Sequence, residues 1–272
     1  MTIRTKKALN FALRVMCVLL ALACVTVILW QANTRRQGQS ANERMRALYD
    51  PTAGAEELSQ TEPAPQTQES FAALLEENPD TVGWLSASQT MDFAVVKRDN
   101  SYYLTHNFFG ESTAEGAAFL DEGNEIYPRD QHLLIHGHNM RDGSVFGDLD
   151  FYRDLTFLQE HALVEFNTIY EDCTYVPFAV FDYSANPGDQ NFIQMQTFNF
   201  ETEDDYMTFV LEAKDRSIYQ IDLDVAVGDP LLSLVTCSYS HDNGRMVVML
   251  RALREGETEQ DIAEVMAQAV LK

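Results

Sequence analysis

Cysteine is scarce in this chain, with four in 272 residues. Two of them, Cys17 and Cys24, lie in an apolar N-terminal run, which leaves Cys173 and Cys237 for the rest of the chain. Two cysteines are too few for a disulfide framework, so we expect the folded part to be held together by ordinary packing. A single Cys173–Cys237 bridge stays open on the count alone, and it would exclude a thiol mechanism.

Basic residues are also few, and they are unevenly placed. The chain has 19 Lys and Arg against 42 Asp and Glu, a net charge of −23. Eight of the basic residues and only one of the acidic residues fall within positions 1–46, so the rest of the chain is strongly acidic. Such a surface repels phosphate backbones, and we therefore expect no nucleic-acid partner.

One long apolar run stands near the N-terminus. Residues 15–30 are almost wholly apolar, and basic residues precede them. A helix needs about 20 such residues to cross the core of a bilayer. We therefore expect residues 1–33 to form a cytoplasmic basic end and a single-pass signal anchor, with the remaining chain outside the cell membrane. A cleaved signal peptide, or a lipoprotein signal at Cys24, is the alternative.

The rest of the chain divides by composition into a stalk, a globular domain and a C-terminal helix. Residues 34–68 are rich in Gln, Ala, Thr, Glu and Pro without apolar periodicity, which predicts a flexible stalk. We place a mainly β domain at 69–254 and a helix in the final segment, 255–272.

Short runs rich in β-branched and aromatic residues predict the strands of this domain. They fall at 91–98, 102–106, 116–120, 133–135, 163–170, 174–183, 231–238 and 245–253. Helical spacing or helix start signals predict helices at 70–77, 146–159, 203–214 and 257–271. The pattern indicates a mainly antiparallel sheet with peripheral helices.

Cys237 ends a nearly all-apolar strand, so we expect its thiol at the rim of the sheet. If residues 238–244 form a wide loop, Arg245 faces Cys237 from the next antiparallel strand. A guanidinium beside a thiol stabilises the thiolate and a developing oxyanion. We favour this interpretation, although a tight turn at Asn243-Gly244 would pair Asp242 with Arg245 instead. The alternative is that Cys237 is a buried structural cysteine without a catalytic role.

Three histidines accompany the apolar strand at 133–135. His132, His136 and His138 would share one face of an extended strand, which is a geometry that zinc can use. No second group of ligands with suitable spacing lies nearby, so we expect neither a metal nor a cofactor. The favoured interpretation is that Gly137 breaks the strand and that His138 emerges in a loop as an acid/base beside Cys237.

Six sequence blocks together resemble the sortases, and specifically the class B sortases. They are NPDTVGWL (78–85), DNSYYL (99–104), HGHNM (136–140), GSVFGDL (143–149), TCSY (236–239) and Arg245. The resemblance spans residues 70–253 and implies a closed eight-stranded sortase-type β-barrel with peripheral helices, preceded by the transmembrane anchor. The helix at 203–214 resembles the extra helix of class B.

The resemblance also implies a function and its residues. It makes Cys237 the nucleophile, His138 the acid/base and Arg245 the residue that holds the substrate carbonyl. We expect further substrate contacts from four residues near Cys237 and His138, namely Thr236, Val235, Ser238 and Asn139. Many sortases carry serine where this chain has Val235, which puts a polar contact from that position in doubt.

We therefore expect a cysteine transpeptidase that cleaves a C-terminal sorting signal on a surface protein through a thioacyl-enzyme intermediate. The acceptor would be an amine of a peptidoglycan precursor or of a pilin. The alternatives are a membrane-tethered binding module with a sortase-like fold but no catalysis, and a papain-type cysteine hydrolase.

Overall fold

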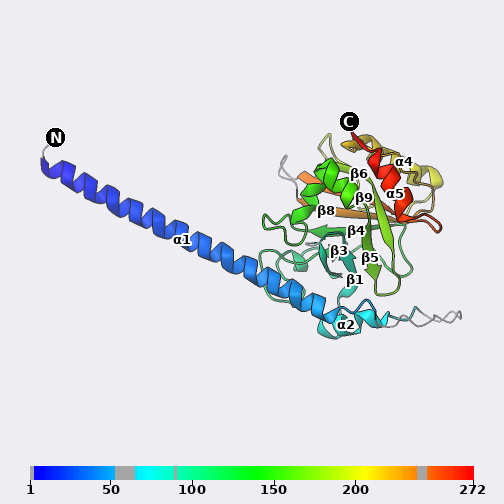
Figure 1. The fold of residues 1–272 in the computed structure, drawn as a ribbon, viewed down its shortest axis with the longest axis horizontal. Coiled ribbons are helices and arrows are strands. Elements are labelled where there is room, and N and C mark those ends of the chain that lie inside the picture. Colours follow the sequence, from blue (N-terminus) through cyan, green and yellow to red (C-terminus); the bar gives the residue numbers. More distant parts are fainter. Residues whose placement is uncertain (1–2, 53–64, 89–90, 238–243) are drawn as a thin grey trace. The chain divides into compact units, whose positions relative to one another are not determined.

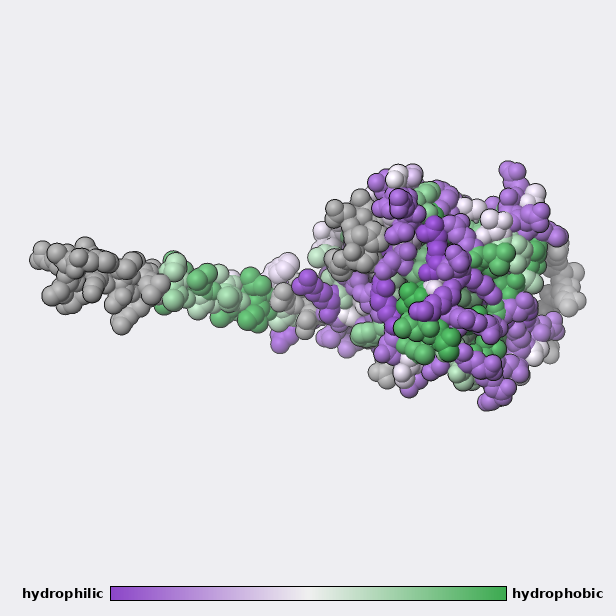
Figure 2. All heavy atoms as spheres, turned by 90° about the horizontal axis from the view of Figure 1, so that it is seen from above, coloured by the Kyte–Doolittle hydropathy of each residue, from purple (hydrophilic) through white to green (hydrophobic). Residues whose placement is uncertain are grey.

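The structure, a computed structural model, describes residues 3–52, 65–88, 91–237 and 244–272. It divides into two units, one ending at Ser40 and one running from Ala41 to Lys272. The first unit consists of most of helix α1 (Ile3–Leu48), on which apolar side chains between Met16 and Trp30 are exposed (Figure 2). Among the described residues, no helix combines the length and the apolar character of a membrane-crossing segment.

The second unit is built around a closed barrel of eight strands (Figure 1). Around the barrel the strands follow the order β1 (Thr81–Ser86), β2 (Asp92–Val96), β3 (Phe119–Leu120), β4 (His132–Gly137), β8 (Leu231–Cys237), β9 (Gly244–Ala252), β6 (Thr174–Ser184) and β5 (Val164–Thr168). Most neighbours are antiparallel, but β4 and β8 run parallel, as do β2 and β3. The expected fold class, a mainly β eight-stranded barrel with peripheral helices, is confirmed for this unit.

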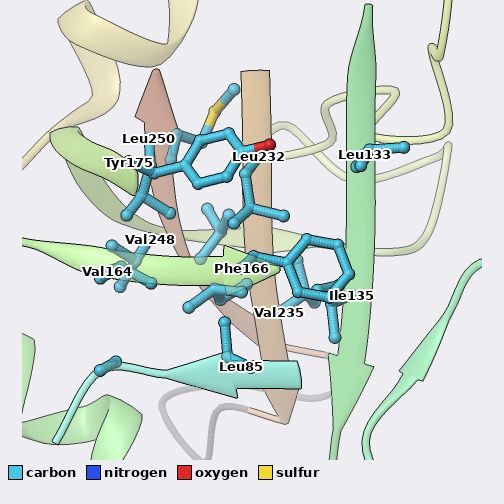
Figure 3. Close-up of a cluster of buried hydrophobic side chains, with 14 of the residues drawn as sticks. Leu85, Leu133, Ile135, Val164, Phe166, Tyr175, Leu232, Val235, Val248 and Leu250 are labelled. Carbon is cyan, nitrogen blue, oxygen red and sulfur yellow. The ribbon is translucent and has the colours of Figure 1, made fainter. Parts of the chain in front are cut away.

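Side chains from six of the strands meet inside the barrel (Figure 3). Leu85, Ile135, Phe166, Val235 and Val248 are each at most 2% exposed. Burying such side chains is the main favourable contribution to folding, at about 25 cal/mol for each Å² of apolar surface. The barrel therefore provides a rigid frame, and the functional groups lie at the ends of its strands.

Helices cover the outside of the barrel. The 3₁₀ turn η1 (Glu69–Phe71) runs into α2 (Ala72–Glu77), and η3 (Gly147–Arg153) runs into α3 (Leu155–Glu160). Helix α4 (Glu203–Arg216) packs against β6 (Figure 1). The Thr202 side chain caps α4 by accepting from the Asp205 N–H, and three acidic residues in the first turn suit the helix dipole.

The C-terminal segment differs from its expected form. Helix α5 (Glu259–Ala267) begins at a capping box between Thr258 and Asp261, but it ends before the predicted limit of 271. The chain then forms β10 (Val270–Leu271), which pairs with β7 (Tyr219–Gln220) in a separate two-stranded sheet. The predicted helix is therefore correct in kind but too long, because its last residues have a strand partner.

One expected strand is absent from the barrel, and one strand of the barrel was not expected. Residues Tyr102–Leu104 form a 3₁₀ turn, η2, because the Asp99 carboxylate accepts from the N–H groups of Ser101 and Tyr102 at 3.0 and 2.9 Å. Strand β1 was not expected, because five of its six residues are buried and an alternating pattern is absent. The predicted number of barrel strands, eight, is therefore correct, although residues 102–106 were predicted in place of β1.

The last turns of α1 belong to the folded unit. Ala41 and Met45 are 6% exposed, and the Tyr49 ring stacks on Trp84 with centroids 4.5 Å apart. Arg46 also pairs with Asp92 at 2.8 Å. These residues lie within 34–68, the segment predicted as a flexible stalk, so the folded unit begins ahead of the expected boundary at residue 69.

Candidate active site

A groove of about 300 Å³ opens where β4 and β8 end and β9 begins. Its lining includes His138, Thr236 and Arg245, three of the residues singled out from the sequence. It also includes Leu104 from η2 and Tyr183 from β6, which the sequence did not single out. The fold therefore brings together residues that lie up to 145 positions apart in the sequence, from Asn100 to Arg245.

Strand pairing places Cys237 opposite Arg245. The register of β8 and β9 pairs Thr236 with Met246 and Cys237 with Arg245. The pairing of Cys237 with Arg245 is the one expected from the sequence, in place of a pairing of Asp242 with Arg245. The side chain of Cys237 and all of Ser238 lie outside the described residues, so the expected contact of Ser238 with substrate stays a prediction.

The parallel pairing of β4 and β8 brings His138 to the same end of the barrel as Cys237. The last pair in this ladder is Gly137 with Thr236, and His138 and Cys237 are the next residues on the two strands. Thr236 is 1% exposed, and its Oγ1 donates to the Gly137 carbonyl at 2.8 Å. A Cβ atom on Gly137 would lie 2.7 Å from the Phe146 ring, so glycine is needed for this close packing.

His138 is held by a backbone carbonyl. Its Nε2 lies 2.8 Å from the Leu104 oxygen. Because a carbonyl only accepts, Nε2 carries the proton and donates it in this contact. An imidazole with a proton on the nitrogen that faces the groove lining is placed to act as an acid.

Arg245 is half-buried at the start of β9. Its Nη1 donates to the Gly244 carbonyl at 3.0 Å, and its backbone pairs with Tyr183 on the other side of the strand. A guanidinium stays charged at any physiological pH and has five N–H donors, and Arg245 also lines the groove.

Asn139 is engaged in a network that leads away from the groove. Its Nδ2 donates to Asp150 at 2.8 Å, and Asp150 accepts from Arg153 at 3.3 Å. Arg153 in turn forms a bidentate ion pair with Asp182 of β6, at 2.6 and 3.1 Å. The network thus fixes the turn that follows His138 to the strand beside Arg245. A direct contact of Asn139 with substrate stays a prediction.

Val235 packs in the barrel core (Figure 3), where it is 2% exposed. It also borders the groove. A serine at this position would place a hydroxyl among the apolar side chains of the core. The valine therefore fits its surroundings, and its contact with substrate stays a prediction.

The three histidines of the zinc alternative have separate partners. His132 is fully buried between the Thr197 carbonyl and the Ser233 hydroxyl, both at 2.8 Å, and burial lowers its pKa to about 4. His136 donates to Asp121 at 2.9 Å. Within the described residues, no three His, Cys, Asp or Glu side chains are grouped as metal ligands.

Cys173 carries a free thiol. Burial raises its pKa, so the thiol form is favoured over the reactive thiolate. The alternative of a Cys173–Cys237 bridge is therefore not realised in this structure, and the objection to a thiol mechanism is removed.

Comparisons with known proteins agree with this geometry. No family model matches the chain. Sortase B from Listeria monocytogenes is 33% identical over 175 residues, which cover 63% of this chain and 69% of that protein. Sortase B from Staphylococcus aureus is 29% identical over 188 residues, which cover 68% of this chain and 75% of that protein.

Solved structures lead to the same family. Sortase B from Bacillus anthracis superimposes with a TM-score of 0.68 at 25% identity, covering 81% of this chain and 97% of that one. Sortase B from Clostridium perfringens gives a TM-score of 0.60 at 28% identity, and the match covers 66% of this chain and 98% of that one. The chain belongs to the sortase B family, and it is a sortase-type cysteine transpeptidase.

Proposed function

We propose that the chain cleaves a C-terminal sorting signal through a thioacyl intermediate on Cys237 and transfers the acyl group to an amine of the cell wall or of a pilin. The observation that carries this proposal is the pairing of Cys237 with Arg245 across β8 and β9, in a groove that His138 also lines. A nucleophile on the strand beside a groove that an acid and a fixed cation line would have the parts that acyl transfer needs.

The proposed reaction has two acyl transfers. The Cys237 thiolate adds to the carbonyl of the scissile peptide bond, and the resulting oxyanion is stabilised by Arg245. The carbon–nitrogen bond then breaks, and His138 gives its proton to the leaving amine. In the second transfer the incoming amine attacks the thioester, gives up a proton to His138, and the Cys237 thiolate leaves. General acid/base catalysis of this kind typically contributes about 10²–10⁴-fold to the rate.

Two solved relatives support the substrate classes. One is a complex of Staphylococcus aureus sortase B with a substrate, and the other is a sortase B bound to triglycine. The first has 25% identity to this chain and a TM-score of 0.63, and the second has 25% and 0.64. By analogy we propose a surface-protein sorting signal as the acyl donor and a peptidoglycan or pilin amine as the acceptor.

We also propose that the enzyme is attached to the cell membrane through α1, with a cytoplasmic N-terminus and an extracellular catalytic unit. The exposed apolar side chains between Met16 and Trp30 support this orientation, together with the basic residues ahead of them. Protease added to intact protoplasts should remove the catalytic unit and leave an N-terminal tag protected. A tag that is cut in intact protoplasts, or a catalytic unit that is protected, would contradict the orientation.

The reaction is tested by intact-protein mass spectrometry with sorting-signal peptides. The wild type should gain the mass of the acyl fragment and should pass it to triglycine when that amine is added. The Cys237→Ala variant should do neither. Adducts on the alanine variant, or no adduct on the wild type with any peptide of a randomised library, would overturn the proposed mechanism. Hydrolysis alone, unchanged by added triglycine, would favour a hydrolase of the papain type.

A further inference from the structure

One wall of the groove comes from a segment without regular structure. Between β6, which ends at Ser184, and α4, which begins at Glu203, the chain forms no helix or strand. Five consecutive residues of this segment, 192–196, line the groove, and we call them the groove wall. The proposed catalytic residues are placed by barrel strands, whereas the position of the groove wall depends on the contacts at its two ends.

The two ends of the groove wall are held in different ways. Beyond its far end, the backbone N–H of His132 in β4 donates to the Phe198 carbonyl at 2.9 Å. At its near end, the guanidinium of Arg216 contacts two consecutive carbonyls. Its Nη1 donates to the Asn191 oxygen at 3.1 Å, and its Nη2 donates to the Phe192 oxygen at 3.0 Å. The near end therefore depends on a single side chain that a substitution can remove.

Arg216 is itself fixed in place. It is the last residue of α4, where a cation suits the helix dipole, and its side chain is only 22% exposed. Glu212, one turn earlier, accepts from its Nε and Nη2 at 3.1 and 2.8 Å, which orients the guanidinium. The next two residues are bonded to Val180 of β6, whose N–H donates to the Ser217 hydroxyl at 3.1 Å and whose carbonyl accepts from the Ile218 N–H at 2.8 Å. Arg216 thus reaches the groove wall from a base that is attached to the barrel.

The C-terminal strand supports the same turn of α4. The Nζ of Lys272, next to β10, donates to the carbonyls of Lys214 and Asp215 at 2.6 and 3.1 Å. The carbonyls in the last turn of a helix have no partner within the helix, so Lys272 supplies donors that α4 lacks. This segment lies beyond residues 70–253, over which the sequence resembles the sortases, and it stabilises the turn that carries Arg216.

We propose that Arg216 is a positioning residue that fixes the near end of the groove wall and thereby determines how tightly the enzyme binds its sorting peptide. Arg216 does not line the groove itself, and it acts through the carbonyls that it holds. A wall that is fixed in advance costs less conformational entropy to order when a peptide binds. Loss of the clamp should weaken the binding of substrate and transition state alike, which raises KM and leaves kcat unchanged. This inference rests on the proposed function, since it concerns the peptide that the enzyme acylates.

The test compares Arg216→Met with the wild type, both as the full chain. The substrate is the peptide of the randomised library that the wild type acylates fastest, and adduct formation is followed by mass spectrometry over a range of peptide concentrations. We expect KM to rise about tenfold, the effect of one or two hydrogen bonds, and kcat to stay within about twofold. The Ser184 N–H still donates to the Asn191 carbonyl at 3.1 Å, so the groove wall should loosen without leaving its place.

Hydrogen–deuterium exchange of the free proteins gives a second readout that needs no peptide. The amides of residues 192–196 should exchange about tenfold faster in Arg216→Met, whereas those of β8 and β9 should exchange as in the wild type. Arg216→Lys keeps the charge but lacks the fork of donors, so it should raise KM by about threefold. This milder variant decides the question if Arg216→Met does not fold.

Arg254→Met is the control for a general loss of stability. The Arg254 side chain is 32% exposed and pairs with Asp224 and Asp229 at 2.8 and 2.7 Å. It therefore resembles Arg216 in burial and in its ion pairs, but none of these three residues lines the groove. The control should keep the wild-type KM and the wild-type exchange at residues 192–196.

The possible results are distinguishable. An unchanged KM in Arg216→Met, or in Arg216→Lys where the methionine variant does not fold, would overturn the inference and leave the proposed function standing. An equal rise of KM in Arg254→Met would also overturn it, because the effect would then be a general loss of structure. So would a fall in kcat at constant KM, since Arg216 would then act on the chemistry. If the wild type acylates no peptide, the proposed function fails and this inference falls with it.

Discussion

The hydroxyl of Thr236 donates to the carbonyl of Gly137 at 2.8 Å, and each of these residues directly precedes a proposed catalytic residue. The bond ties the ends of β8 and β4 together, so it limits how far Cys237 and His138 can move apart. An error of about 1 Å in such a geometry can lower a rate by about a hundredfold.

We expect Thr236→Val to lower kcat by about tenfold or more and to leave the Gly137 carbonyl without its partner. A buried carbonyl that loses its donor costs about 1–3 kcal/mol of unfolding free energy. Acylation rates and urea denaturation measure the two effects. Thr236→Ser keeps the hydroxyl and should stay near the wild type in both; equal damage from serine and valine would mean that the methyl group, not the hydrogen bond, matters.

The Arg153 network should matter for rate at a distance from the groove. Arg153→Met removes the link between Asp150 and Asp182, so the turn after His138 loses its tie to β6. We expect a fall in kcat of roughly tenfold with a smaller change in KM, since Arg153 is not among the residues that line the groove.

A suitable control for the Arg153 network is Arg46→Met, which breaks a surface pair with Asp92 outside the groove. Exposed pairs of this kind contribute about 0–1 kcal/mol, so this variant should keep its rate. An unchanged kcat in Arg153→Met would show that the network does not position His138.

His132 should make the stability of the fold depend on pH. Burial lowers the pKa of His132 to about 4, whereas an unfolded histidine has a pKa of about 6.5. Between these two pKa values His132 is protonated in the unfolded chain and neutral in the folded chain. The free energy of unfolding should therefore fall as pH falls from about 6.5 to about 4. The expected loss is about 3 kcal/mol at 1.36 kcal/mol for each pKa unit.

The pH prediction is measured as the difference between wild type and His132→Gln in denaturant titrations at several pH values. Arg129 favours the neutral imidazole, and Asp130 and Asp121 oppose it, but burial is the largest effect. The variant should lack the extra slope between pH 6.5 and 4. Parallel stability profiles for the two proteins would contradict the prediction.

The end of α1 should stabilise the catalytic unit. A chain of residues 41–272 retains Met45 and the stacking of Tyr49 on Trp84, whereas a chain of residues 69–272 loses both. We expect the free energy of unfolding of the shorter chain to be about 2–4 kcal/mol lower than that of the longer chain, because the apolar burial of Met45 and the ring contact of Tyr49 are lost. Tyr49→Ala in the longer chain should show part of this loss, and identical unfolding of all three chains would mean that the segment adds nothing.

The pairing of Cys237 with Arg245 could be predicted because it depends on local sequence: an apolar strand, a polar connection of known length and a second apolar strand. Strand β4 could also be predicted, because its apolar residues are followed by Gly137. Strand β1 was missed because its burial on both faces removes the alternation that marks a strand. The 3₁₀ turn at Tyr102 depends on the side chain of Asp99, which competes with strand pairing.

The hydrogen bonds of the buried Asp121 with Asn100, His136 and Gln196 could not be predicted, because these partners lie 21, 15 and 75 residues away and meet only when the barrel closes. The same holds for the engagement of Asn139 by Asp150. A sequence pattern shows which side chains can donate and accept, but the choice among partners is made by tertiary packing.

The parallel pairing of β4 with β8 also determines when the enzyme can become active during folding. Gly137 and Thr236 are 99 residues apart in the sequence, and contacts of such long range form late because closing a long loop costs entropy before any contact repays it. A chain that is still folding therefore carries a thiol without its acid. The two groups meet only when the barrel closes, so acyl transfer requires the closed barrel.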